Sequence, residues 1–139
     1  MATIVYGGIA TETPRAQAEG DALWLGPQDL ARASGWELKP EGLCRDEVCI
    51  PVPAAQSSAL LRQQGGETWV NLTAFARHLG QPQANGEGAW YFGETPEAYH
   101  TRLLALEAPD FTLPAYDGKT YSLSGVRDKK VLLLLWASW

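Results

Sequence analysis

Cys44 and Cys49 are the only thiols in this 139-residue chain and the first candidates for chemistry. Arg45, Asp46 and Glu47 follow Cys44 in a segment that is otherwise mostly apolar. Charged residues between two apolar runs predict a β-hairpin with a short loop. The two cysteines would then lie on the two arms of the hairpin, where they could act as a redox pair.

The neighbouring charges have opposing effects on the reactivity of this pair. The Arg45 guanidinium favours the thiolate of Cys44, whereas Asp46 and Glu47 oppose it. Cysteine is also among the most buried residue types, so both side chains could instead be small apolar core residues. The sequence leaves these interpretations open, and Cys44 and Cys49 are the candidate catalytic residues.

A metal site is the next hypothesis for the cysteines. The spacing between them reaches the upper end of that found in zinc sites, and His78 and His100 would have to complete the ligand set. Each histidine lies on a different predicted helix, and no named zinc motif is present. The chain also lacks the Gly-x-Ser-x-Gly and His-Glu-x-x-His motifs of hydrolases. We therefore expect neither a metal nor another cofactor.

The elements that position these residues show an internal repeat, because the chain resembles itself after a shift of about 45 residues. Equivalent positions hold a strand tryptophan, a helical Ala-Arg pair and a glycine: Trp24 and Trp69, Ala31-Arg32 and Ala76-Arg77, and Gly35 and Gly80. Pro27 and Gly35 bound the first predicted helix, and Asn71 or Thr73 caps the second. The fold class predicted is α+β, with two copies of a small β-α-β unit packed as one domain.

Residues 20–93, which contain the two copies, resemble the repeat of the copper amine oxidase N-terminal, or stalk, domain. There too a strand is followed by a short Ala-rich helix that ends in glycine. The resemblance implies a binding or spacing element that need not hold copper. Because Trp24 and Trp69 are equivalent strand positions, we expect both in the core. Trp36 and Trp90 are the candidates for a binding surface.

Two further elements complete this first domain. Asn85-Gly86 predicts a hairpin turn, with residues 90–92 as the return strand. Thr95 as N-cap and Pro96 in the first turn predict the start of a third helix. That helix ends before Pro109, and we place the domain boundary near residue 107, giving domains 1–107 and 108–139.

The segment 108–139 has a different composition. It contains, in order, Ala-Pro-Asp-Phe, Asp-Gly-Lys, Ser-Leu-Ser and Lys-Lys-Val, and then Trp-Ala-Ser-Trp at 136–139. Asp117-Gly118 predicts a hairpin turn, and the apolar run Val131–Leu135 predicts a buried strand. This order closely resembles the start of the redoxin group, the thiol peroxidases and thiol-disulfide reductases of the thioredoxin superfamily. In that group the next residues form the Cys-x-x-Cys site.

The resemblance implies a nucleophilic thiolate at a helix N-terminus and a second cysteine that resolves the mixed disulfide. Residues 108–139 contain no cysteine. We therefore expect a β-hairpin and one apolar strand of an incomplete thioredoxin-like fold, inactive in that chemistry. The break fits a UGA selenocysteine codon that was translated as a stop, and it fits equally an artificial boundary or a frameshift.

The composition and charge of the chain limit the classes of partner that it can bind. The net charge is −5, the pI is about 4.9 and the basic residues are scattered, which argues against nucleic acid and anionic membranes. No apolar run is long enough to span a bilayer and no secretory signal is present, so we expect a cytoplasmic protein. An uncovered strand at Val131–Trp136 would be prone to association, which predicts a homodimer through this segment.

Taken together, the sequence predicts the N-terminal portion of a thioredoxin-like thiol oxidoreductase or peroxidase that lacks the active-site thiols. The alternative is a non-catalytic module that binds a protein or a small ligand. A further alternative is a small enzyme or redox switch that uses Cys44 and Cys49.

Overall fold

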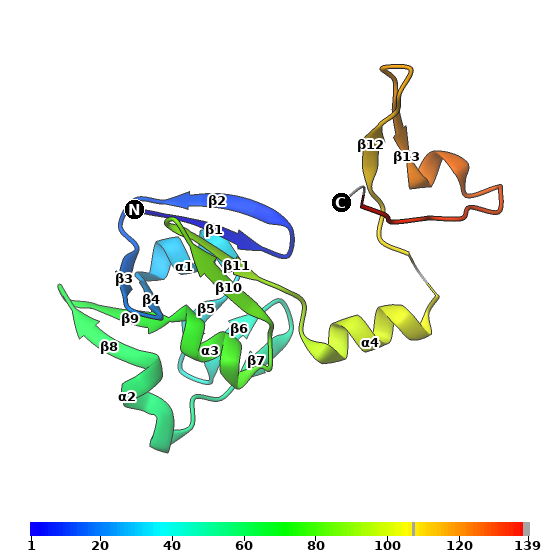
Figure 1. Cartoon of the computed structure of the whole chain (residues 1–139). Helices are drawn as coiled ribbons and strands as arrows, with labels where there is room; N and C mark the ends of the chain where they lie inside the picture. Colours follow the sequence, from blue (N-terminus) through cyan, green and yellow to red (C-terminus); the bar gives the residue numbers. More distant parts are fainter. Residues whose placement is uncertain (107, 138–139) are drawn as a thin grey trace. The chain divides into compact units, whose positions relative to one another are not determined.

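A computed structural model describes residues 1–106 and 108–137 (Figure 1). These residues form a mixed α+β structure with four α-helices and several small sheets, which confirms the α+β class that the sequence predicts. The chain divides into two compact units, residues 1–99 and 100–139. The division falls inside the third predicted helix, before the boundary predicted near residue 107, and residue 107 itself lies outside the described residues.

The first sheet brings the two ends of unit 1 together. It consists of β10 (Gln83–Gly86), β11 (Ala89–Phe92), β1 (Ala2–Tyr6) and β2 (Ile9–Thr13), in that order. β1 is parallel to β11, with Ile4 opposite Trp90, and antiparallel to β2. Alternate residues of β1 (Ala2, Ile4, Tyr6) are buried, as expected for a strand with one face on the core.

The second sheet carries the two strands that the repeat predicts. Its order is β3 (Gln17–Glu19), β4 (Ala22–Leu25), β9 (Glu67–Asn71) and β8 (Leu61–Gln64), with all neighbours antiparallel. β4 leads into α1 (Pro27–Ser34), and β9 leads into α3 (Leu72–His78). Trp24 and Trp69, at equivalent places on these strands, are both buried.

The helix ends follow the sequence closely. Gly35 ends α1 in the left-handed conformation (φ 73°), and its N–H donates to the Ala31 carbonyl. Asn71 caps α3, since its side chain accepts a hydrogen bond from the Ala74 N–H. Thr73 does not serve as this cap because its hydroxyl donates to the Asn71 side chain and accepts from the Leu23 N–H.

The third sheet is the hairpin that holds the cysteines, preceded by one more strand. β5 (Glu37–Lys39), β6 (Gly42–Arg45) and β7 (Val48–Ile50) pair in sequence order. Gly42 (φ 137°) lies so close to the next strand that a Cβ there would be 2.1 Å from the Ile50 carbonyl oxygen. A short 3₁₀ turn, η1 (Ala54–Gln56), and α2 (Ser57–Leu60) connect this sheet to β8.

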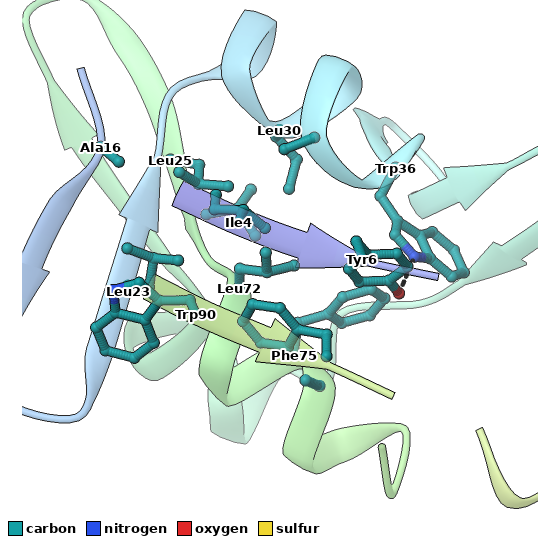
Figure 2. Packing of buried hydrophobic residues seen from close by; sticks show 14 of the residues in the cluster. Ile4, Tyr6, Ala16, Leu23, Leu25, Leu30, Trp36, Leu72, Phe75 and Trp90 are labelled. Carbon is teal, nitrogen blue, oxygen red and sulfur yellow. Dashed lines mark hydrogen bonds between the residues drawn. The ribbon is translucent and has the colours of Figure 1, made fainter. Parts of the chain in front are cut away.

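One core unites the three sheets and their helices in unit 1. Figure 2 shows Ile4 of β1, Leu25 of β4, Leu30 of α1, and Leu72 and Phe75 of α3 within this cluster. All five side chains are at most 1% exposed. Burial of a large apolar side chain contributes about 1.5–3 kcal/mol, so this unit has its own source of stability.

The turn predicted at Asn85-Gly86 is wrong by two residues. Both residues lie in β10, where Gly86 pairs with Ala89, and the turn is formed by Glu87 and Gly88. Glu87 (φ 51°) and Gly88 (φ 80°) both have positive φ, which is the geometry of a tight two-residue hairpin turn. The return strand itself is confirmed as β11.

Unit 2 contains the second hairpin that the sequence predicts. α4 (Pro96–Leu104) begins in unit 1 with its Thr95 cap and continues into unit 2. β12 (Thr112–Pro114) pairs with β13 (Thr120–Ser122) around the Asp117-Gly118 turn, and η2 (Leu123–Val126) follows.

Asp110 fastens the start of this hairpin to η2. Its carboxylate accepts the Ser124 N–H at 2.8 Å. Hydrogen bonds from the Ser124 side chain and backbone lower the pKa of Asp110 below its ordinary value. Because the pKa of Asp110 is lowered in the folded state, its ionised carboxylate stabilises the fold at neutral pH. This stabilisation is lost as the pH falls through the pKa of the folded state.

The strand predicted at Val131–Leu135 is not formed. Residues 131–137 have no sheet partner among the described residues, and Ser138 and Trp139 of the Trp-Ala-Ser-Trp motif lie outside them. Every side chain from Val131 to Trp136 is at least 50% exposed. A strand requires a neighbour for its backbone N–H and C=O groups, and the apolar composition alone does not provide one.

Candidate functional site

The two cysteines lie directly opposite each other on β6 and β7. Cys44 pairs with Cys49 in the strand register, and their sulfurs form a disulfide. The turn between the strands consists of Asp46 and Glu47, and Asp46 has a positive φ of 53°, a conformation that aspartate tolerates better than most residues. The structure therefore confirms the predicted hairpin and brings the candidate redox pair together.

The two sulfurs have different access to solvent. Cys44 is buried (2% exposed), and its sulfur lies 3.9 Å from the Gly42 carbonyl oxygen, whereas Cys49 is exposed. Thiol–disulfide exchange depends on which sulfur an attacking thiolate can reach. Attack on this disulfide would therefore occur at Cys49, with Cys44 as the leaving group.

A pocket of about 510 Å³ opens beside the same hairpin. Its volume lies within the range of roughly 300–1,000 Å³ that is typical of small-molecule sites. The lining comes from the hairpin, from Trp36 and Leu79, and from the start of α4; the remaining members are Arg45, Asp46, Val48, Ile50, Thr95, Pro96, Glu97 and Ala98. All of them belong to unit 1.

Arg45, next to the disulfide, is the basic residue in the lining of this pocket. Its guanidinium lies over the Trp36 ring at 4.9 Å and over the Tyr6 ring at 5.8 Å. Its aliphatic stem crosses Gly35, where a Cβ would lie 3.2 Å from the Arg45 Cδ. Aromatic faces attract a cation through their quadrupole, so the side chain is held in place without an acid.

A chain of buried and part-buried hydrogen bonds includes the two rings that Arg45 covers. Trp36 Nε1–H donates to the Tyr6 hydroxyl at 2.9 Å, drawn dashed in Figure 2. The Tyr6 hydroxyl donates to Gln81 Oε1 at 2.9 Å, and Gln81 Nε2 donates to the Gly93 carbonyl at 2.8 Å. We call these four residues the Tyr6 network. Every polar atom of the two aromatic side chains in it is thereby satisfied.

The structure places the two predicted surface tryptophans in the core, each at the wall of a pocket. Trp36 is 4% exposed and lines the pocket beside Arg45. Trp90 is 6% exposed and lines a separate, smaller pocket of about 230 Å³ together with Arg77, Gln83 and Asn85. The structure does not bring Trp36 and Trp90 to one site.

The histidines are not gathered with the cysteines. His78 lies on α3 and His100 on α4, and both are exposed. Within residues 1–106 and 108–137, no group of three or more His, Cys, Asp or Glu side chains is placed to hold a metal ion. The disulfide also leaves neither cysteine free to act as a thiolate ligand.

Sequence reasoning missed Tyr6 and Gln81. Tyr6 ends an alternating strand at the N-terminus, and Gln81 follows the glycine after α3, so neither stands in a recognisable motif. Their roles come from the parallel pairing of β1 with β11, which joins segments more than 80 residues apart. The only available signal was a tyrosine on a strand that is otherwise apolar on its buried face.

No known protein family, curated protein or solved structure matches this chain. Among the described helices, none is both long enough and apolar enough to cross a membrane.

We predict that the disulfide stabilises unit 1 measurably. Closing so short a loop (sequence separation 5) removes roughly 2 kcal/mol of conformational entropy from the unfolded chain. The double variant Cys44→Ala, Cys49→Ala should therefore unfold at a lower urea concentration than the oxidised protein. The measurement is urea unfolding followed by tryptophan fluorescence.

The same titration with dithiothreitol provides the control. The reductant should lower the midpoint of the wild-type protein and leave the double variant unchanged. A shift of similar size in the double variant would show that the effect does not come from the disulfide.

Proposed function

We propose that this chain is the N-terminal portion of a thioredoxin-like thiol oxidoreductase or peroxidase. The observation that carries the proposal is the apolar segment Val131–Trp136, whose side chains are 50–89% exposed. Continuous runs of this composition are typical of central strands that are covered on both faces. In the proposed whole protein, this segment is the central strand that leads to the active-site thiols.

The hairpin β12–β13 supports the same proposal. It precedes the apolar segment, with η2 between them, in the order that the redoxin resemblance implies. In the same proposal, unit 1 is an added domain formed from two copies of a small β-α-β unit. Residues 108–139 contain no cysteine, so the thiol chemistry of that family is not performed by this part of the protein.

We predict that the native gene product is larger than 15.1 kDa and is a thiol oxidoreductase. Antibodies raised against residues 1–99 should detect the larger protein in the source cells. The captured protein should reduce insulin disulfides or consume peroxide, and the recombinant 139-residue chain should do neither. A native product of 15.1 kDa without a downstream frame would contradict the proposal.

The exposed apolar segment also leads us to propose a homodimer of the 139-residue chain. Unpaired backbone groups and apolar side chains favour pairing with a second copy, either between the two segments or by strand exchange. A second copy pairs the backbone groups of the segment and covers its apolar side chains. In a whole thioredoxin-like domain, other elements would do this.

We predict a mass of twice 15.1 kDa in multi-angle light scattering at micromolar concentration. The double variant Leu133→Lys, Leu135→Lys places charges in the segment and should shift the mass to that of the monomer. Leu104→Lys is the matched control because Leu104 is also exposed (70%) but lies on α4. A monomeric wild-type chain would contradict the homodimer.

A second function, a redox switch or small redox enzyme within unit 1, is favoured by the access of Cys49. A thiolate of a dithiol reductant attacks the Cys49 sulfur, the bond to Cys44 breaks, and Cys44 leaves as a thiolate that takes up a proton. The second thiol of the reductant then displaces Cys49. The cysteine pair gains two electrons, and the reductant becomes a disulfide.

The cytoplasmic location remains a proposal, and it depends on the same chemistry. Disulfides are reduced in most cytosols and persist in oxidising compartments. A cytoplasmic protein with this disulfide would therefore use it reversibly, whereas a purely structural disulfide would favour an oxidising compartment.

We predict that the Cys44–Cys49 pair has a reduction potential above about −300 mV, the value below which disulfides are usually structural. The measurement is equilibration in glutathione and dithiothreitol buffers, followed by alkylation and mass spectrometry. As a check on the mechanism, the single thiol of Cys44→Ser should react with a maleimide faster than that of Cys49→Ser. A potential well below this limit would leave the disulfide a structural role only.

The pocket beside the hairpin favours a third function for unit 1, the non-catalytic binding module. The carrying observation is its volume of about 510 Å³, with Trp36, Val48, Ile50 and Leu79 in the lining. Concave sites with mostly apolar walls and a few polar groups are typical of ligand binding. Trp36 belongs to this site, and Trp90 would serve the smaller one.

A further inference from the structure

We infer that the pocket beside the disulfide hairpin binds a small monocarboxylate with an apolar body, with the carboxylate on Arg45. The inference rests on the proposed binding module and specifies the chemical class of its ligand. It is independent of the thioredoxin-like part of the protein, because every lining residue belongs to unit 1.

The first argument is the state of the Arg45 guanidinium. Among the described residues, no carboxylate lies within 4 Å of it and no side-chain or backbone acceptor takes its protons. Its contacts are the faces of Trp36 and Tyr6, which attract the charge but accept no hydrogen bond in the guanidinium plane. The fork of N–H donors is therefore available to a planar carboxylate, which it matches in geometry.

The second argument is that Arg45 is fixed in advance. The disulfide closes the hairpin at the neighbouring residue, the stem lies across Gly35, and the Tyr6 network fixes both aromatic rings. A preorganised donor loses little side-chain entropy when a ligand binds.

The third argument concerns the rest of the lining, which selects the ligand. Val48, Ile50 and Leu79 offer an apolar wall beside the ring of Trp36. Asp46 and Glu97 are exposed members of the same lining. Their charges disfavour phosphates and dicarboxylates, whereas one carboxylate can reach the half-buried Arg45, where electrostatic attraction is stronger than in water.

The test uses two dyes that differ by one acidic group. The probe 8-anilinonaphthalene-1-sulfonate carries one anionic group on an aromatic body, and N-phenyl-1-naphthylamine is its uncharged counterpart. Titration with the anionic dye should shift the indole N–H signal of Trp36 in a ¹⁵N-resolved NMR spectrum. This readout separates the pocket from dye binding at the exposed segment Val131–Trp136.

Variants then test the role of the charge. Arg45→Gln should lower the affinity for the anionic dye by about tenfold or more, the loss expected for a hydrogen bond to a charged group. It should leave the affinity for the neutral dye nearly unchanged. Arg15→Gln is the matched control, since Arg15 also lies over a tryptophan but is paired with Glu67. Asp46→Asn, which keeps a residue suited to positive φ, should strengthen binding of the anionic dye.

The outcomes distinguish the ligand class from the binding module. If both dyes shift the Trp36 signal equally and Arg45→Gln changes neither affinity, the pocket binds apolar molecules. The inference that its ligand is a carboxylate is then wrong. If neither dye shifts that signal at saturation, the module itself is wrong. If Arg45→Gln and Arg15→Gln weaken the anionic dye equally, the effect is general attraction, and Arg45 is not the anchor. A shifted Trp36 signal that is selectively weakened in Arg45→Gln supports the inference, and indole-3-acetate should then compete with the dye.

Discussion

The Tyr6 network is the interaction on which the rest of unit 1 depends. Its four members come from the end of β1, the segment after α1, the segment after α3 and the residue after β11. A buried polar group without a partner costs about 1–3 kcal/mol, so each member requires the others to be in place. The network therefore links the sheet of β1 and β11 to the segments that follow α1 and α3, and the apolar residues around it supply the stability.

The network also determines what the hairpin can do. Because the Tyr6 hydroxyl accepts from Trp36 and donates to Gln81, neither side chain can leave its position without losing a buried hydrogen bond. These two rings are the faces over which the Arg45 guanidinium lies. The disulfide holds the hairpin from one side and the rings hold Arg45 from the other, so a charged side chain at the end of a strand has a defined position.

The sequence predicted the local elements of unit 1 because their causes are local. Pro27, Gly35 and Asn71 mark helix ends by their own backbone preferences, and the charged turn marks the cysteine hairpin. Tyr6 and Gln81 could not be predicted, since their partners are set by the parallel pairing of β1 with β11, and periodicity does not reveal which strands pair. Val131–Leu135 shows the opposite case: the composition of a strand is present, but no neighbour among the described residues completes it.

The two units differ in how far each one buries its own apolar side chains. This difference separates the proposed functions. Unit 1 has its own core of buried apolar side chains, the Tyr6 network and the disulfide, so a ligand site or a redox switch there requires no other part of the protein. Unit 2 leaves an apolar segment exposed, so its role depends on what covers that segment. A substitution at Arg45 should therefore leave the proposed association through Val131–Trp136 unchanged. Conversely, charges placed in that segment should leave the hairpin pocket intact.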